Sequence, residues 1–149
     1  MSIDLLGSLP LEVSGYGLSS LRPNTKFYDM CYLKLKFPSD IFVFINIGWL
    51  SPIKKRNMTI VGNKNRIVFD DTVRKKIAIT KNLDIKSETH YPSFSNNSPL
   101  SMEILSFVDL IKNKSKRNNL GVKMGLNVVR VIEACEKSMQ AGGKSIKIN

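Results

Sequence analysis

The sequence predicts an α+β domain in which a mainly antiparallel, open-faced β-sheet carries helices packed on one face. Three observations predict this class. Short alternating apolar and polar segments occupy residues 11–80, two segments with helical periodicity follow between residues 98 and 140, and a last alternating segment closes the chain. Most connections between the early strands are long enough for hairpins and too short for parallel crossovers.

The length of 149 residues and a hydrophobic content of 42% predict one domain, residues 1–149, that buries a core. We expect a cytoplasmic location, because no apolar run approaches the 18 or more residues of a membrane span and the N-terminus does not resemble a secretory signal. The two cysteines, Cys31 and Cys135, have no metal-like or redox-like spacing. We therefore expect them to be buried, reduced thiols.

The first two strands are expected at residues 11–17 and 28–37, where apolar and polar side chains alternate. In the second strand the apolar face carries Cys31, Leu33, Leu35 and Phe37. Pro38 and Asp40 then favour a turn.

Residues 41–50, "IFVFINIGWL", are apolar on both faces for most of their length. This pattern predicts a central strand covered on both faces, or covered by a helix on one face and a second subunit on the other. Three short strands follow, at residues 56–62, 66–70 and 76–80, with turns between them.

From residue 82 to 98 the periodicity disappears, which predicts a long loop that is either functional or simply packed on the surface. Ser98 is suited to cap a helix that begins at Pro99. A second helix is expected over residues 122–140 and a final strand over residues 144–149, with a glycine pair between them.

Trp49 together with Lys54, Lys55 and Arg56 is the one segment that combines a large aromatic face with cations. These residues could hold an anionic or sugar-bearing ligand, because guanidinium groups bind phosphate and aromatic faces stack on flat groups. Alternatively, the tryptophan covers the sheet and the cations form a solvated turn. We carry Trp49, Lys54 and Arg56 forward as substrate-side candidates.

His90 is the only histidine, and it could contact a substrate or face water. We add it to the substrate-side candidates. Asp70 and Asp71 could bind a metal only through a bulge, because adjacent strand residues point to opposite faces. We expect a solvated turn there, and no metal site.

The net charge of +11 and the pI near 9.8 raise the possibility of nucleic-acid binding. The basic residues are spread along the chain and do not interleave with aromatics as a single-strand platform requires. Nucleic-acid binding is therefore the least favoured of our hypotheses.

Five segments in the same order resemble the C-terminal domain of the Gfo/Idh/MocA oxidoreductases, the family of glucose-fructose oxidoreductase and inositol dehydrogenase. They are "LLGSLPLEVSGYG", "YDMCYLKLKFPSDIFVFINIGWLSP", "RNMTIVGNKNRIVFDD", "SPLSMEILSFVDLIKN" and "GLNVVRVIEACEKSMQAGGKSIKI". The family often has glycine where this chain has Asp40. Residues 2–7 are similar either to the segment after the family histidine or to the end of that helix, in which case Asp4 has no catalytic role.

The resemblance implies that NAD(P) is the cofactor of the parent enzyme and that a Rossmann domain, an E-K-P motif and a D-x-G-x-H segment carry its chemistry. All three would lie before Met1. We therefore expect no catalytic residue and no cofactor-binding residue in this chain, and no cofactor bound by the chain alone.

The leading hypothesis is a detached or truncated substrate-binding and oligomerisation domain of an NAD(P)-dependent sugar, cyclitol or nucleotide-sugar oxidoreductase, inactive alone. Its partner would be a second copy meeting it through the sheet face, or a separately encoded Rossmann subunit. The alternative is a free-standing dimeric interaction module, because an exposed apolar sheet face requires cover.

Overall fold

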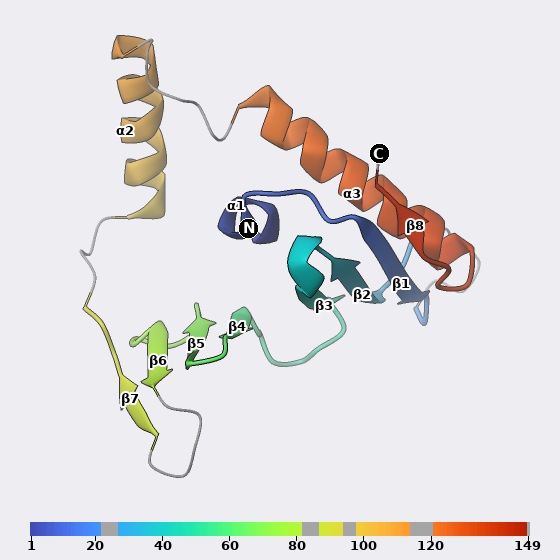
Figure 1. Cartoon of the computed structure of the whole chain (residues 1–149), viewed down its shortest axis with the longest axis horizontal. Helices are drawn as coiled ribbons and strands as arrows, with labels where there is room; N and C mark the ends of the chain where they lie inside the picture. The colour runs from blue at the N-terminus through green and yellow to red at the C-terminus, as the bar shows by residue number, and fades with distance from the viewer. Residues whose placement is uncertain (22–26, 82–86, 94–97, 114–120, 149) are drawn as a thin grey trace. The chain divides into compact units, whose positions relative to one another are not determined.

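The computed structural model describes residues 1–21, 27–81, 87–93, 98–113 and 121–148. The strands in these ranges pair into two four-stranded sheets, and every pairing is antiparallel (Figure 1). The predicted α+β class is confirmed, although the strands form two sheets instead of one. The contacts group the chain into two compact units, Met1–Leu50 with Ser115–Asn149 and Ser51–Lys114. That residues 1–149 form one domain stays a prediction.

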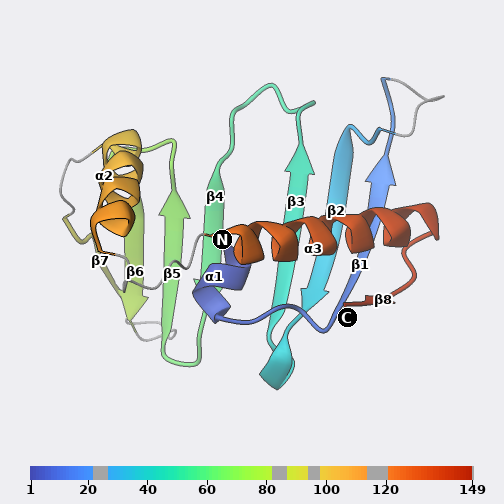
Figure 2. The same ribbon diagram turned by 90° about the horizontal axis from the view of Figure 1, so that it is seen from above.

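The first unit contains a sheet with the strand order β3-β2-β1-β8 (Figure 2). The apolar positions lie on one face because register partners share a face, as in the row of Val13, Leu35 and Val43. Strand β3 stands at the end of this order and not in the middle, where the sequence had predicted it. The strands are β1 (Glu12–Leu18), β2 (Met30–Lys36), β3 (Phe42–Gly48) and β8 (Ile146–Lys147).

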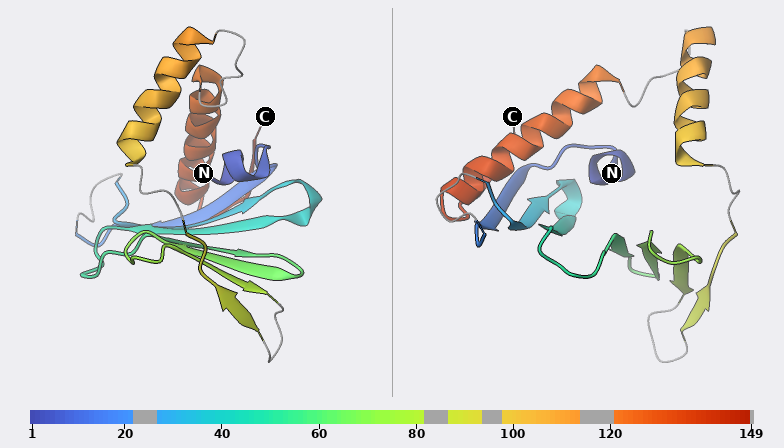
Figure 3. Two further views of the ribbon diagram at one scale, coloured as in Figure 1. Left: turned by 90° about the vertical axis from the view of Figure 1, so that its left-hand side faces the viewer. Right: turned by 180° about the vertical axis from the view of Figure 1, so that it is seen from behind.

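Helix α3 (Val122–Gln140) packs across the apolar face of this sheet (Figure 3, right). The sequence predicted its bounds correctly from the periodicity. A short helix, α1 (Ser2–Leu6), adds Ile3 and Leu6 to the margin of the core. The core residues come from β1, the β2 segment and α3: Val13, Leu35, Phe37, Val131, Ala134 and Cys135.

Ser138 fixes α3 to strand β1, beyond the short stretch of β1 that pairs with β8. Its hydroxyl accepts the backbone N–H of Gly15 at 3.0 Å and donates to the carbonyl of Lys144 at 2.6 Å. Strand β8 pairs with β1 only at Glu12 and Val13, so it offers no partner to the N–H of Gly15. The fully buried serine supplies that partner instead.

The end of α3 depends on Gly142 and Gly143, which have φ of +67° and +87°. These values are accessible to glycine and costly for other residues. A Cβ on Gly143 would also clash with the ring of Tyr16, whereas a Cβ on Gly142 would meet open space. The expected glycine stop is therefore confirmed, and its second glycine has a packing role as well.

The turn between β2 and β3 is Pro38–Asp40, as the sequence predicted. Ser39 and Asp40 have φ of 59° and 54° there, the conformation that tight hairpins require. Aspartate tolerates this left-handed conformation better than most residues other than glycine and asparagine.

The second unit contains a sheet with the strand order β4-β5-β6-β7. Strand β7 lies inside the segment that the sequence predicted to be a loop, and the hydroxyls of Thr80 and Thr89 lie 3.2 Å apart where it pairs with β6. Residues 82–86 and 94–97 of that segment fall outside the described residues. The strands are β4 (Asn57–Val61), β5 (Asn65–Asp70), β6 (Ile77–Lys81) and β7 (Glu88–His90).

Helix α2 (Pro99–Lys112) begins as the sequence predicted. The Ser98 side chain accepts the backbone N–H of Ser101 at 3.1 Å, and Pro99 occupies the first turn. Among the described residues, no helix is long and apolar enough to cross a membrane.

Candidate functional site: the basic end of the second sheet

At one end of the second sheet β4 begins, β5 ends and β6 begins (Figure 2). The segments that meet there carry six cationic residues. Two backbone hydrogen bonds join the segments there: Asp71 N–H donates to the Arg56 carbonyl at 2.9 Å, and Asp70 N–H donates to the Lys76 carbonyl at 2.8 Å. All six side chains are exposed. We call this group the basic end: Lys54, Lys55, Arg56, Arg74, Lys75 and Lys76.

Asp71 holds two of these cations. Its carboxylate lies 2.6 Å from the Lys76 ammonium and 3.8 Å from the Arg56 guanidinium. The hydrogen bond and charge of Lys76, then the charges of Arg56 and Lys54, hold the pKa of Asp71 below its ordinary value. The carboxylate therefore stays ionised and keeps these cations close together.

Asp70 has a local, structural role. Its carboxylate accepts both the backbone N–H of Thr72 at 2.8 Å and the Thr72 hydroxyl at 2.6 Å. These bonds lower the pKa of Asp70. The turn expected at this aspartate pair is thus present, and the described residues contain no cluster of three or more metal-ligating side chains.

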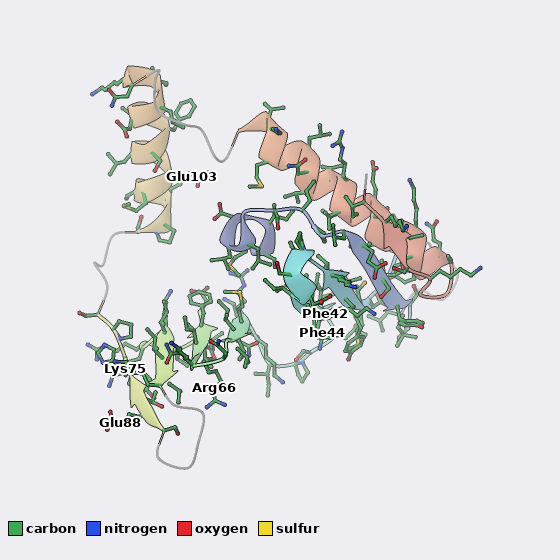
Figure 4. The ribbon with its side chains drawn as sticks, in the orientation of Figure 1. Phe42, Phe44, Arg66, Lys75, Glu88 and Glu103 are labelled. Atoms are coloured by element: carbon green, nitrogen blue, oxygen red, sulfur yellow. The ribbon has the colours of Figure 1, made fainter. Side chains whose placement is uncertain are left out.

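Tyr91, which follows β7, reaches the basic end, whereas His90 pairs with Ile79 in the middle of β6. The Lys75 ammonium lies 4.8 Å from the centre of the Tyr91 ring, within the range of a cation–π contact. Figure 4 shows Lys75 on this sheet, together with Arg66 and Glu88. His90 itself is exposed.

Of the four substrate-side candidates, the structure brings two to this end of one sheet: Lys54 and Arg56. His90 lies in line with Ile79 and Ile67, nearer the opposite end. Trp49 belongs to the first unit, so its partnership with the two cations stays a prediction. Sequence reasoning missed Arg74 and Lys75, which it treated as part of a turn, and Lys76, which it placed at the start of a strand. Hairpin geometry could have revealed them. In a run of antiparallel hairpins, the turn between β5 and β6 lies at the same end of the sheet as the start of β4.

The open face of the first sheet carries a second candidate, a shallow groove of about 480 Å³. Aromatic side chains dominate it, and Phe42 and Phe44 point away from α3 (Figure 4). The rings of Phe42 and Phe44 stack with their centroids 6.5 Å apart. The polar groups that line the groove are few and include Ser14, Lys34 and Asn46.

The described residues do not fit the nicotinamide dinucleotide that the family resemblance implies for the parent enzyme. A dinucleotide site needs a parallel sheet whose strand leads through a glycine-rich turn into a helix. Both sheets are antiparallel throughout, and the side chain of Ser98 already caps the N-terminus of α2. No step of hydride transfer can therefore be assigned to these residues.

Comparison with known proteins agrees with the architecture. The chain matches the sequence model of the oxidoreductase family, C-terminal alpha/beta domain, over residues 1–148. No curated protein matches it.

Solved structures share the fold at low identity. An aldose-aldose oxidoreductase from Caulobacter crescentus is 20% identical with a TM-score of 0.78, covering 98% of this chain and 43% of its own. A UDP-N-acetylglucosamine 3-dehydrogenase from Acidithiobacillus ferrooxidans is 17% identical with a TM-score of 0.76, over 93% and 46%. An inositol dehydrogenase homolog from Azotobacter vinelandii, complexed with NADH and myo-inositol, is 11% identical with a TM-score of 0.70, over 93% and 44%.

The chain thus spans less than half the length of these solved chains. The family match covers nearly every residue, and the order of strands and helices is the one expected from the resemblance. The chain belongs to the Gfo/Idh/MocA oxidoreductase family and corresponds to its C-terminal alpha/beta domain.

Proposed function

We propose that this chain is the substrate-binding and oligomerisation domain of an NAD(P)-dependent oxidoreductase and is inactive on its own. The substrate class would be a sugar, a cyclitol or a nucleotide-sugar. Hydride transfer would require a nucleotide-binding domain in addition, because the described residues lack a parallel strand–turn–helix unit that could hold the cofactor.

One observation carries the proposal: the family match extends over residues 1–148, while the chain covers only 43–46% of the three solved oxidoreductases compared above. Those three proteins are an aldose-aldose oxidoreductase, an inositol dehydrogenase homolog complexed with myo-inositol, and a nucleotide-sugar dehydrogenase. These compounds supply the substrate class for the proposal.

Reconstitution tests this function. The source genome is searched for a reading frame that encodes a nucleotide-binding domain of on the order of 100–150 residues without a C-terminal domain of its own. That domain is produced with and without this chain, and NADH formation from NAD⁺ is followed with glucose, myo-inositol and a UDP-sugar. The proposal predicts turnover only when both polypeptides are present. Turnover by this chain alone would contradict it.

A second candidate function is a free-standing module that dimerises through the open face of the first sheet. The observation that favours it is the exposure of large apolar side chains on that face. Phe44 is 76% exposed, and Tyr16 and Tyr32 are more than half exposed. Burial of such a face against a second copy would remove this area from water.

Light scattering after size-exclusion chromatography measures the mass directly. We expect a dimer or larger assembly for the wild type and a monomer for Phe44→Glu, which places a charge on the open face. Val122→Glu is the matched control, because Val122 is 92% exposed on α3, away from that face. A wild-type monomer at high micromolar concentration would refute dimerisation through the sheet.

A further inference from the structure

The charges at the basic end are not balanced. Six cations stand there, while only Asp70 and Asp71 are carboxylates within the turn. Asp70 is engaged with Thr72, and Asp71 is shared between Lys76 and Arg56. The described segment from residue 51 to 81 contains no other acidic side chain. A local positive potential therefore remains at this end.

Arg56 retains donors for a ligand. Its guanidinium meets the Asp71 carboxylate at 3.8 Å, beyond good hydrogen-bond length, and its side chain is 67% exposed. A guanidinium has five N–H donors in a planar fork that matches two oxygens of a phosphate. Lys76, which is half exposed, stays next to it because the same carboxylate binds both.

Lys75 is held from the other side of the turn. Its ammonium contacts the Tyr91 ring, and this contact restricts the rotamers of the Lys75 side chain. Less side-chain entropy is then lost when an anion binds. Two of the cations are thus positioned by Asp71 and a third by an aromatic ring. Such preorganisation favours a compact anion with several charged oxygens.

The opposite end of the sheet offers a contrast. Arg66 and Lys81 lie there, and Lys81 pairs in register with Glu88, which supplies an opposite charge directly across the strands. No aromatic side chain among residues 61–66 or 79–81 accompanies these cations. The two ends of one sheet therefore differ in how their cations are arranged.

We propose that the basic end of the second sheet binds a small phosphate-bearing molecule. Arg56 and Arg74 would donate hydrogen bonds to the phosphate oxygens. The ammonium groups of Lys54, Lys75 and Lys76 would attract the negative charge of the phosphate. A diphosphate ester suits the cluster better than a single sulfate-like ion, because the cations arrive from two separate segments. The inference concerns the second unit alone and does not depend on the proposed oxidoreductase function.

A small molecule fits this cluster better than a nucleic acid does. Proteins that bind single strands provide several aromatic rings on which successive bases stack. Among the described residues of this end, Tyr91 is the one exposed aromatic side chain, and Lys75 already contacts it, while Phe69 is half-buried.

The test is a titration of the ¹⁵N-labelled full chain with inorganic pyrophosphate and with uridine diphosphate, and with glucose as a neutral control. We expect saturable shifts of the backbone amides of Asp71 and Thr72 with both diphosphates and none with glucose. Raising the salt from 50 to 200 mM should weaken binding. The absence of saturable shifts at 50 mM salt would overturn the proposal.

Two double variants locate the site. Arg56→Gln/Arg74→Gln removes two charges from the basic end and leaves the pair of Lys76 with Asp71, so affinity should fall about tenfold or more. Lys64→Gln/Arg66→Gln removes the same charge from the opposite end, and affinity should change by less than about threefold. Equal losses in both variants would mean that net charge alone attracts the anion, which contradicts a site.

A competition experiment distinguishes the alternative ligand. A fluorescent single-stranded oligonucleotide is added at 150 mM salt, followed by excess uridine diphosphate. The proposal predicts weak oligonucleotide binding that uridine diphosphate displaces. Tight oligonucleotide binding that resists displacement would identify a nucleic-acid surface and overturn the small-molecule proposal.

Discussion

Replacing Ser138 with alanine removes the hydroxyl that joins α3 to β1 and to the turn after the helix. Ser138 has no exposed surface, and its hydroxyl is the partner of the buried N–H of Gly15. The vacated space is that of one hydroxyl group, less than a water molecule needs, so no water can take its place. The N–H of Gly15 would therefore be left without a partner.

The magnitude follows from the two lost hydrogen bonds. An unsatisfied buried donor costs about 1–3 kcal/mol, and the lost bond to the Lys144 carbonyl, which lies nearer the surface, costs roughly 1 kcal/mol or less. We expect Ser138→Ala to lower the free energy of unfolding of the first unit by about 2–3 kcal/mol. With a urea m-value of about 1–3 kcal/mol/M, the midpoint should fall by about 0.7–3 M.

Urea unfolding followed by Trp49 fluorescence is the assay, because Trp49 lies in the first unit. The control is Ser145→Ala. Ser145 also donates a hydrogen bond, to Glu12 at 3.0 Å, but at an exposed position, so its loss should change stability by less than about 0.5 kcal/mol. If the two variants lose the same free energy, the hydroxyl of Ser138 does not have the role we assign to it.

Two further predictions concern the glycine stop and the basic end. Gly142→Ala should destabilise the first unit by about 1–2 kcal/mol, the cost of a positive φ alone. Gly143→Ala should destabilise it by more, because the added Cβ also clashes with the ring of Tyr16. Equal urea midpoints for the two variants would refute the packing role of Gly143. Lys76→Met should raise the pKa of Asp71 towards 3.8, measured by ¹³C NMR of the carboxyl carbon. Since Lys76 lowers that pKa in the folded state, its stabilisation is present near neutral pH and lost as pH falls through the folded pKa. An unchanged pKa would show that the ion pair does not form in solution.

The sequence was sufficient for most of the elements of the first unit. Alternation placed β1 and β2, and a helical stripe together with a glycine pair gave the bounds of α3. These signals are local, because each depends on which face of one element is buried. Cys135 is buried and Cys31 half-buried, and burial raises the pKa of both thiols, as expected for unreactive cysteines.

Features that depend on distant partners could not be predicted. Strand β7 has three exposed, polar residues and no alternation of its own, and its pairing with β6 defines it. The division of the strands between two sheets depends on pairing, which alternation does not specify. Ser138 belongs to a residue type that is usually exposed, so nothing in the sequence indicated that it would bridge α3 and β1.

The candidate site was predicted in part. Lys54 and Arg56 were identified because they follow an aromatic residue in sequence, yet the structure groups them with the turn at residues 74–76 instead. That grouping results from antiparallel pairing of β4 and β5, which brings Asn57 opposite Asp70. Sequence proximity was thus a poorer guide to this site than strand register.

The proposed function holds that this domain does not bind NAD(P) by itself. Titration of the isolated chain with NADH, followed by the fluorescence of Trp49, its single tryptophan, tests this claim most directly. With inner-filter correction against N-acetyltryptophanamide, the account predicts no saturable change up to millimolar NADH. Saturable quenching with micromolar affinity would show that the chain holds the cofactor by itself and would contradict the account.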